Sequence, residues 1–120
     1  MRLGVSLPQC GEAASPDAVR DNAREAEALG YDSVWVLDRV LYPVNPRVPY
    51  AATADGSLPP SYKRVFDPLT TLTFAAAYTE RVALGTSVLN LPFYNPVLLH
   101  KQLTTLDILS KGRLRVTFGT

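Results

Sequence analysis

The sequence predicts an α/β fold in which short parallel strands alternate with helices. Four apolar runs, most of them without alternating polar residues, have the character of strands that are covered on both faces of a sheet. They are Leu3–Leu7, Ser33–Leu37, Val82–Val88 and Leu114–Phe118. Three segments with helical periodicity lie between these runs, so the order along the chain is a repeated strand–helix unit.

Each helical segment begins with the same signal, a capping side chain followed by proline. The three pairs are Ser15-Pro16, Asp67-Pro68 and Asn95-Pro96. The cap oxygen accepts a free N–H of the first turn, and proline suits the first helical position because it has no N–H. Gly30 and Gly112 follow the first and third segments, where a left-handed residue often ends a helix. The residues that carry the helical pattern are Val19, Ala23 and Ala26, then Leu69, Leu72, Thr73 and Ala76, then Leu99, Leu103 and Leu106.

The interval between the second and third strands is the longest of the three. The extra length lies in a segment rich in proline and tyrosine, at about residues 39–66, and its five prolines exclude a regular helix or a central strand. A loop of this length is more often a lid or a binding loop than a filler, and the alternatives are an oligomer contact or a segment that drifted without a function. We therefore expect a single partial barrel domain over residues 1–120 with this insertion after its second strand.

Composition and charge exclude several classes of protein. Of the 120 residues, 47% are hydrophobic and 19% are charged, which is the composition of a folded domain and not of a disordered chain. The net charge of +1 gives no reason to expect nucleic acid or an anionic membrane as a partner. No apolar stretch approaches the ~20 residues of a membrane span. One cysteine and one histidine exclude a cysteine-based or histidine-rich metal site, no metal is assigned, and a cytoplasmic location is expected.

The chemistry is expected at the carboxyl ends of the strands, because ligands bind at that end of parallel α/β sheets. The segments that meet there are Pro8–Cys10, Asp38-Arg39, Ser87–Asn90 and Gly119-Thr120. An acid at the end of a strand hydrogen-bonds either a ligand or the N–H groups of the next loop. Small residues from Gly85 onward either let a flat ligand approach the backbone or belong to a packed strand that ends in a turn.

The remaining polar and aromatic residues are assigned to ordinary structural places. Four acidic residues on or beside the first helix are expected on a solvated face. They are Glu12, Asp17, Glu25 and Glu27. Trp35, in the middle of the second strand, is expected in the core. His100 belongs to an outer helix and no sequence neighbour activates the Cys10 thiol, so neither residue is assigned a catalytic role.

Five segments share a pattern with one known family. They are Ala26–Val36 with Asp38, Asp67–Thr70, Thr79–Val88, Leu91–Pro96 and Thr105–Leu114. They cover almost the whole chain in the family's order, and the Ser-x-Gly-Arg-Leu stretch after an amphipathic helix is the most specific of them. In this set the sequence resembles the luciferase-like monooxygenase superfamily, and within it the branch of oxidoreductases that depend on the deazaflavin coenzyme F420.

The resemblance implies that the chain is the N-terminal half of a (β/α)8 TIM barrel whose cleft binds flavin or deazaflavin. It also implies a non-proline cis peptide at Ser87-Val88, behind the cofactor ring. By this resemblance the cofactor-binding residues are Asp38, Arg39, Ser87, Val88, Asn90, Gly119 and Thr120. Many deazaflavin enzymes have histidine, an acid or base, where this chain has Arg39. Because arginine stays charged, it would hold an anionic ring or substrate, and no general base is assigned.

The function implied by the resemblance is hydride transfer between coenzyme F420 and an organic substrate. An FMN-dependent monooxygenase on the same fold is the nearest alternative. A different class of function is a catalytically silent half barrel, in which two copies associate through their open edges. A small doubly wound domain of the response-regulator type also fits the length. The expected partners are a small-molecule substrate and a second copy of the chain, with neither nucleic acid nor membrane.

Overall fold

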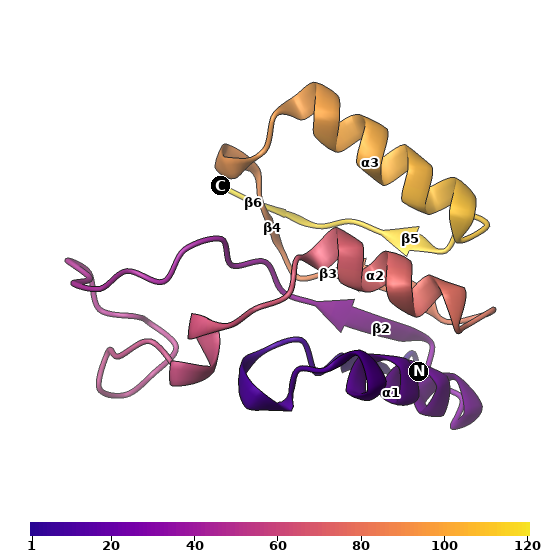
Figure 1. Ribbon diagram of the computed structural model, residues 1–120, viewed down its shortest axis with the longest axis horizontal. Coiled ribbons are helices and arrows are strands. Elements are labelled where there is room, and N and C mark those ends of the chain that lie inside the picture. Colours follow the sequence, from indigo (N-terminus) through magenta and orange to yellow (C-terminus); the bar gives the residue numbers. More distant parts are fainter.

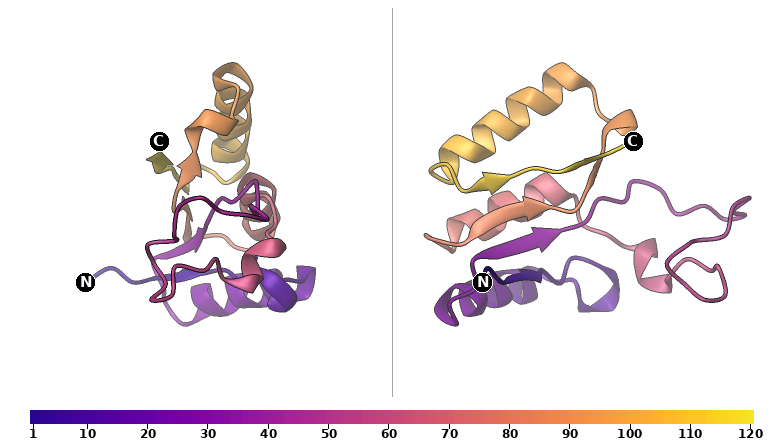
Figure 2. Two further views of the ribbon diagram at one scale, coloured as in Figure 1. Left: turned by 90° about the vertical axis from the view of Figure 1, so that its left-hand side faces the viewer. Right: turned by 180° about the vertical axis from the view of Figure 1, so that it is seen from behind.

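The computed structural model describes residues 1–120 and shows a parallel sheet with helices packed against it (Figure 1). Four strands form this sheet in the order β1-β2-β3-β5. They are β1 (Gly4–Ser6), β2 (Ser33–Val36), β3 (Ala83–Thr86) and β5 (Leu114–Arg115). The order in the sheet follows the order in the chain, so successive crossovers place their helices on the same face (Figure 2). This is the arrangement of half a (β/α)8 barrel. A doubly wound sheet would reverse its strand order at a switch point, so the response-regulator alternative is wrong.

Three helices connect the strands, and each begins at its predicted cap. They are α1 (Pro16–Ala28), α2 (Pro68–Ala77) and α3 (Pro96–Leu109), and three short 3-10 turns accompany them, η1 (Gly11–Ala13), η2 (Pro60–Lys63) and η3 (Leu91–Phe93). The side chains of Ser15, Asp67 and Asn95 all accept backbone N–H groups of the first turn. Gly30 and Gly112 have φ angles of 84° and 79°, as a left-handed helix end requires. No helix in the structure has both the length and the apolar character that crossing a membrane demands.

The apolar core lies between the sheet and the helices. Parallel pairing aligns Val34 with Leu84 and Leu84 with Leu114, so these side chains form a row beneath the helices. Leu72 of α2 is completely buried against this layer. Burying an aliphatic side chain of this size contributes roughly 1.5–3 kcal/mol, and the core therefore fixes the sheet on which the site is built.

The opposite face of the sheet carries small side chains and Trp35. A Cβ atom added at Gly85 would lie 2.2 Å from Cε3 of Trp35, and one added at Gly4 would lie 2.5 Å from its Nε1. The indole therefore fills the space that these two glycines leave. Trp35 is half-buried on this open face, so the expectation that it belongs to the core is wrong. Strand alternation places it opposite Val34 and Val36, which do face the helices.

Two of the predicted strands are each divided in the structure. The run Val82–Val88 holds β3, which ends at Thr86, and β4 (Leu89–Asn90) begins just after the run. The run Leu114–Phe118 holds β5 and the first residue of β6 (Phe118–Gly119). The short strands β4 and β6 pair as a second parallel sheet. The peptide between Ser87 and Val88, at the first division, is cis.

Threonine side chains join the two divided strands at this point. The Thr86 hydroxyl accepts the N–H of Thr117 at 3.0 Å, and the Thr117 hydroxyl donates to the carbonyl of Thr86. These contacts replace ladder hydrogen bonds, because a hydroxyl can serve as donor or acceptor for a nearby backbone group. The main ladder therefore ends here and a second one begins beyond it.

The insertion leaves the C-terminal end of β2, extends beyond the sheet and returns through η2 (Figure 1). As its prolines predict, it contains neither an α-helix nor a strand of the sheet. Its final residues attach to the loop after β1. Val65 forms an antiparallel bridge with Cys10, and the N–H of Phe66 donates to the carbonyl of Gln9 at 3.0 Å. Both ends of the insertion are thus fixed at the carboxyl ends of the strands.

Candidate functional site

Asp38, two residues beyond β2, connects the ends of two strands. Its side chain is buried, and its Oδ2 accepts the backbone N–H of Asn90 at 2.9 Å. The Asn90 amide returns a hydrogen bond to the carbonyl of Asp38, also at 2.9 Å. Asp38 thus holds a backbone N–H, as one of its two expected roles requires, but this N–H belongs to β4 and not to the next loop. The same contacts bring two predicted site residues, Asp38 and Asn90, together.

Tyr94 completes this cluster, and the sequence did not identify it. Its hydroxyl donates to Oδ2 of Asp38 at 3.0 Å. Burial raises the pKa of Tyr94 well above its ordinary range, and the hydrogen bond and charge of Asp38 raise it further. The phenol therefore stays a neutral donor. The available signal was its place in the loop before the Asn95 cap, at the edge where a ligand is expected.

Gln9, which follows β1, holds neighbouring segments together at the carboxyl ends of the strands. It is 1% exposed, and its amide nitrogen donates to the carbonyls of Leu37 and Phe66 at 3.0 Å each. Its Oε1 accepts the N–H of Leu37 at 2.6 Å. One side chain thus joins the ends of β1 and β2 to the returning end of the insertion. It lies in the predicted segment Pro8–Cys10, but its part is structural.

A cavity of about 250 Å³ opens at the carboxyl ends of the strands. Its lining residues are Asp38, Arg39, Val40, Leu41, Asn90 and Phe93. Three of them, Asp38, Arg39 and Asn90, are residues that the sequence assigned to the cofactor. The position matches the end of a parallel sheet at which ligands bind, and the lining combines a carboxylate, a guanidinium and an amide with apolar surface.

Arg39 points toward the aromatic residues of the insertion. Its guanidinium carbon lies 4.6 Å from the ring centre of Tyr62 and 5.7 Å from that of Tyr50. The two rings meet edge to face, with their centres 6.1 Å apart. The Nε of Arg39 is buried and has no hydrogen-bond partner. Burial raises the pKa of the Cys10 thiol, and the nearby charge of Arg39 lowers it by less. The thiol therefore remains protonated.

The other predicted site residues lie along β4 and β6. A Cβ atom added at Gly119 would lie 2.7 Å from Cγ2 of Val88, so the two strands approach closely there. Asn90 pairs with Gly119 across the small sheet. Ser87 and Thr120 are exposed. The structure therefore brings Asp38, Val88, Asn90 and Gly119 to one region and gives Ser87 and Thr120 no side-chain hydrogen bond.

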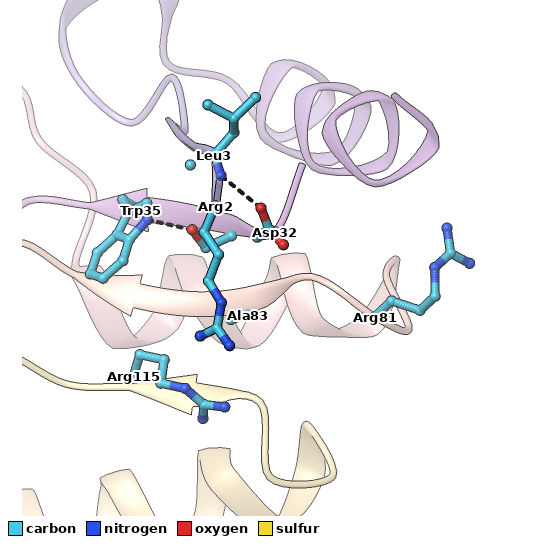
Figure 3. Close-up of a pocket in the computed structure, with 9 residues that line it drawn as sticks. Arg2, Leu3, Asp32, Trp35, Arg81, Ala83 and Arg115 are labelled. Carbon is cyan, nitrogen blue, oxygen red and sulfur yellow. Dashed lines mark hydrogen bonds between the residues drawn. The ribbon is translucent and has the colours of Figure 1, made fainter. Parts of the chain in front are cut away.

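A larger cavity, of about 650 Å³, lies at the opposite end of the sheet (Figure 3). Arg2, Arg81 and Arg115 contribute to its lining, together with Trp35, whose Nε1 donates to Ser33 at 2.8 Å. It is close to the amino ends of the strands, where barrels carry residues for stability and not for catalysis. The smaller cavity at the carboxyl ends is therefore the candidate site.

Comparison with known proteins assigns the whole chain to one family. The sequence matches the family described as luciferase-like monooxygenase over residues 1–120. It is 36% identical over 119 residues to the F420-dependent glucose-6-phosphate dehydrogenase of Kineococcus radiotolerans, covering 98% of this chain and 31% of that enzyme. The chain spans between 31% and 42% of the length of the curated relatives.

Solved structures align over the same residues. The monooxygenase RslO1 from Streptomyces bottropensis aligns with a TM-score of 0.72 and 30% identity, covering 99% of this chain and 33% of that one. A type II Baeyer–Villiger monooxygenase, the oxygenating constituent of 3,6-diketocamphane monooxygenase from Pseudomonas putida in complex with FMN, aligns with a TM-score of 0.74. It covers 99% of this chain and 29% of that one at 17% identity, and so shows the fold alone.

Proposed function

The chain belongs to the luciferase-like monooxygenase family, and on this premise we propose that it forms the N-terminal part of an F420-dependent oxidoreductase. The proposed reaction is hydride transfer between the deazaflavin and an organic substrate. When bound, F420 supplies the hydride chemistry, and the protein supplies binding and orientation. The observation that carries the proposal is the hydrogen-bonded pair of Asp38 and Asn90, which places the ends of β2 and β4 on one cavity.

The residues of this cavity suit a polar, planar ring system. Both strong donors to Asp38, the N–H of Asn90 and the hydroxyl of Tyr94, bind its Oδ2. Its Oδ1 receives no hydrogen bond from the chain and is available to a ring N–H. The guanidinium of Arg39 lines the same cavity, and its Nε is buried without a hydrogen-bond partner. We propose that Asp38 and Asn90 orient the ring, with Val88, Ser87, Gly119 and Thr120 bordering it, and that Arg39 lies on the substrate side of the cavity.

The proposed preference for F420 over FMN rests on the relatives. The F420-dependent glucose-6-phosphate dehydrogenases are 32–36% identical to this chain, whereas the FMN-containing neighbour shares the fold at 17% identity. The monooxygenase RslO1, at 30% identity, is the reason that an FMN-dependent monooxygenase remains the alternative. The two activities differ in their need for oxygen, because hydride transfer to or from F420 proceeds without it.

A fluorescence titration tests the proposal. The purified chain is titrated with F420 and, in parallel, with FMN. We expect saturable binding of F420 and a dissociation constant about tenfold higher for Asp38→Asn, which corresponds to about 1.4 kcal/mol. Asp17→Asn, on the exposed surface of α1, is the matched control and should bind as the wild type does. Preferential binding of FMN together with oxygen-dependent turnover would favour the monooxygenase, and no binding of either cofactor would refute a site formed by this chain.

The sheet itself favours a second candidate, a silent half barrel that self-associates. Strands β1 and β5 lie at the two edges of the four-stranded sheet, and each has one unpaired side. Two copies that met through these edges would close a single barrel-like sheet. Sedimentation analysis distinguishes the candidates. A monodisperse dimer that binds neither cofactor supports the silent assembly, and a monomer that binds F420 contradicts it.

A further inference from the structure

We propose that Arg39 binds an oxyanion, a carboxylate or phosphate group of the substrate, at the cavity between β2 and β4. Arg39 lines this cavity beside Asp38 but forms no ion pair with it or with any other acid. Both ion pairs of the chain belong to Arg20, on the outer surface of α1. The candidate site therefore contains a full positive charge that no carboxylate of this chain neutralises.

The hydrogen-bonding groups of Arg39 are also unused. A guanidinium has five N–H donors, and none of the side-chain hydrogen bonds in the structure comes from Arg39. Its Nε is buried away from water as well as from protein acceptors. The two terminal NH2 groups also have no partner in the chain, but they are not among its buried unpartnered atoms, so they are the donors that a ligand in the cavity can reach.

The aromatic residues position the guanidinium without satisfying it. The faces of Tyr62 and Tyr50 attract the positive charge at 4.6 Å and 5.7 Å, but a ring face does not replace an oxygen acceptor. Both tyrosines are held by the backbone of the insertion. The N–H of Tyr50 donates to Gly56 at 2.8 Å, and that of Tyr62 donates to Pro59 at 3.0 Å. Because the two tyrosines already position the guanidinium, Arg39 loses little conformational freedom when a ligand binds. The site is therefore pre-organised.

An oxyanion is the ligand that such a group selects. The planar guanidinium presents paired donors that match two oxygens of a carboxylate or phosphate, and its charge is neutralised at the same time. A neutral carbonyl would accept a hydrogen bond and leave the charge unpaired. The inference therefore narrows the substrate to an acidic organic molecule. The assignment of the oxyanion to the substrate, and not to the cofactor, rests on the proposed function.

The test uses inorganic phosphate and acetate as probes, with no cofactor present. The Nε–H signal of Arg39 is followed by NMR while each probe is added, and binding is measured by calorimetry. We expect a saturable shift of that signal with at least one probe. Arg39→Met should weaken binding of that probe at least tenfold, and Arg39→Lys by a smaller factor. Arg47→Met, an exposed arginine of the same insertion, is the charge-matched control and should leave binding unchanged.

Each outcome decides the proposal. Absence of a saturable shift in the wild type, or equal affinity in Arg39→Met, would overturn it. If Arg39→Met fails to fold by circular dichroism, the wild-type signal and Arg39→Lys still test the proposal.

A final experiment repeats the F420 titration in saturating phosphate. Unchanged F420 affinity is expected, whereas competition would place the oxyanion on the cofactor and overturn the substrate assignment. Phosphate binding without F420 binding would refute the proposed function and leave the oxyanion site standing.

Discussion

The carboxylate of Glu27, at the end of α1, accepts the backbone N–H of Val82 at 2.9 Å, immediately before β3. The same carboxylate accepts the N–H groups of Glu80 and Arg81, the latter at 2.6 Å. One side chain thus satisfies three successive backbone donors that precede a central strand. The expectation that Glu27 lies on a solvated face is wrong, because these partners are more than 50 residues away in the sequence and no local pattern records them.

Replacing Glu27 with Gln should lower the free energy of unfolding by about 1 kcal/mol at neutral pH. The amide keeps one acceptor oxygen but turns an NH2 group toward backbone donors. Urea unfolding measures the change, and Glu25→Gln on the exposed side of the same helix is the control. Equal losses in the two variants would contradict a specific role for Glu27.

The same pair of variants carries a pH dependence. Burial acts to raise the pKa of Glu27, but the three backbone donors outweigh it and hold the pKa below its ordinary value of 4.5. A lowered pKa in the folded state stabilises the protein above the ordinary value and ceases to do so as the pH falls through the folded pKa. The stability gap between wild type and Glu27→Gln should therefore be full at neutral pH and shrink in acid below 4.5. A gap that is constant with pH would count against this account.

Gly85→Ala should displace the indole of Trp35 and destabilise the sheet by about 1–3 kcal/mol, because the added methyl overlaps the ring at 2.2 Å. Trp35 is the only tryptophan, so its fluorescence maximum reports the displacement directly. Removing the ring should relieve the overlap. The added cost of Gly85→Ala, measured as a melting temperature in a Trp35→Leu background, is expected to be close to zero. Additive losses in the double variant would show that the two residues do not compete for space.

Much of the fold could be predicted because its signals are local. A cap and a proline are adjacent in the chain, and each helix-ending glycine lies within three residues of the end of its helix. The convergence of Asp38 and Asn90 could also be predicted, because parallel strands place their carboxyl ends at one edge. The resemblance to the family gave the cis peptide at Ser87-Val88, which the structure contains.

The features that the sequence did not reveal depend on distant partners. After Ser33 the run Ser33–Leu37 is apolar, so the pattern did not indicate which face of the sheet Trp35 occupies. The face that each side chain occupies is set by the side on which the helices cover the sheet. The division of the third and fourth strands depends on Thr86 and Thr117, which meet only when the sheet has formed. Tyr94 is similar, since its role follows from the distance to Asp38 and not from its neighbours in the sequence.

Gln9→Leu should destabilise the protein by about 3 kcal/mol, because it leaves the N–H and C=O of Leu37 and the C=O of Phe66 without their partner in a buried place. The loss should appear first where the insertion rejoins the sheet. Hydrogen exchange of the Phe66 N–H, which donates to the Gln9 carbonyl, is the local measurement. Gln102→Leu, on the exposed surface of α3, is the control. Unchanged exchange at Phe66 would mean that the amide does not anchor the insertion.

Tyr94→Phe should remove the tyrosine that resists ionisation most strongly. Burial and the carboxylate of Asp38 raise the pKa of Tyr94 above its ordinary value of 10.0. A raised pKa in the folded state stabilises the protein fully below the ordinary value, and this contribution is lost as the pH rises above it. Wild type should therefore lose stability above pH 10.0 in part through Tyr94, and Tyr94→Phe should lose less. At neutral pH the variant should be less stable by about 1 kcal/mol, the usual worth of such a hydrogen bond.

Ultraviolet titration of the phenols checks this directly. The chain has six tyrosines, and the last step of the wild-type titration should be absent from Tyr94→Phe. Tyr78→Phe, at a residue that is 43% exposed, is the matched control and should retain that last step. If the highest step survives in Tyr94→Phe, the Asp38 carboxylate is not bound by a neutral phenol. In that case the cluster of Asp38, Asn90 and Tyr94 would lose one of the two donors that hold its acid in place.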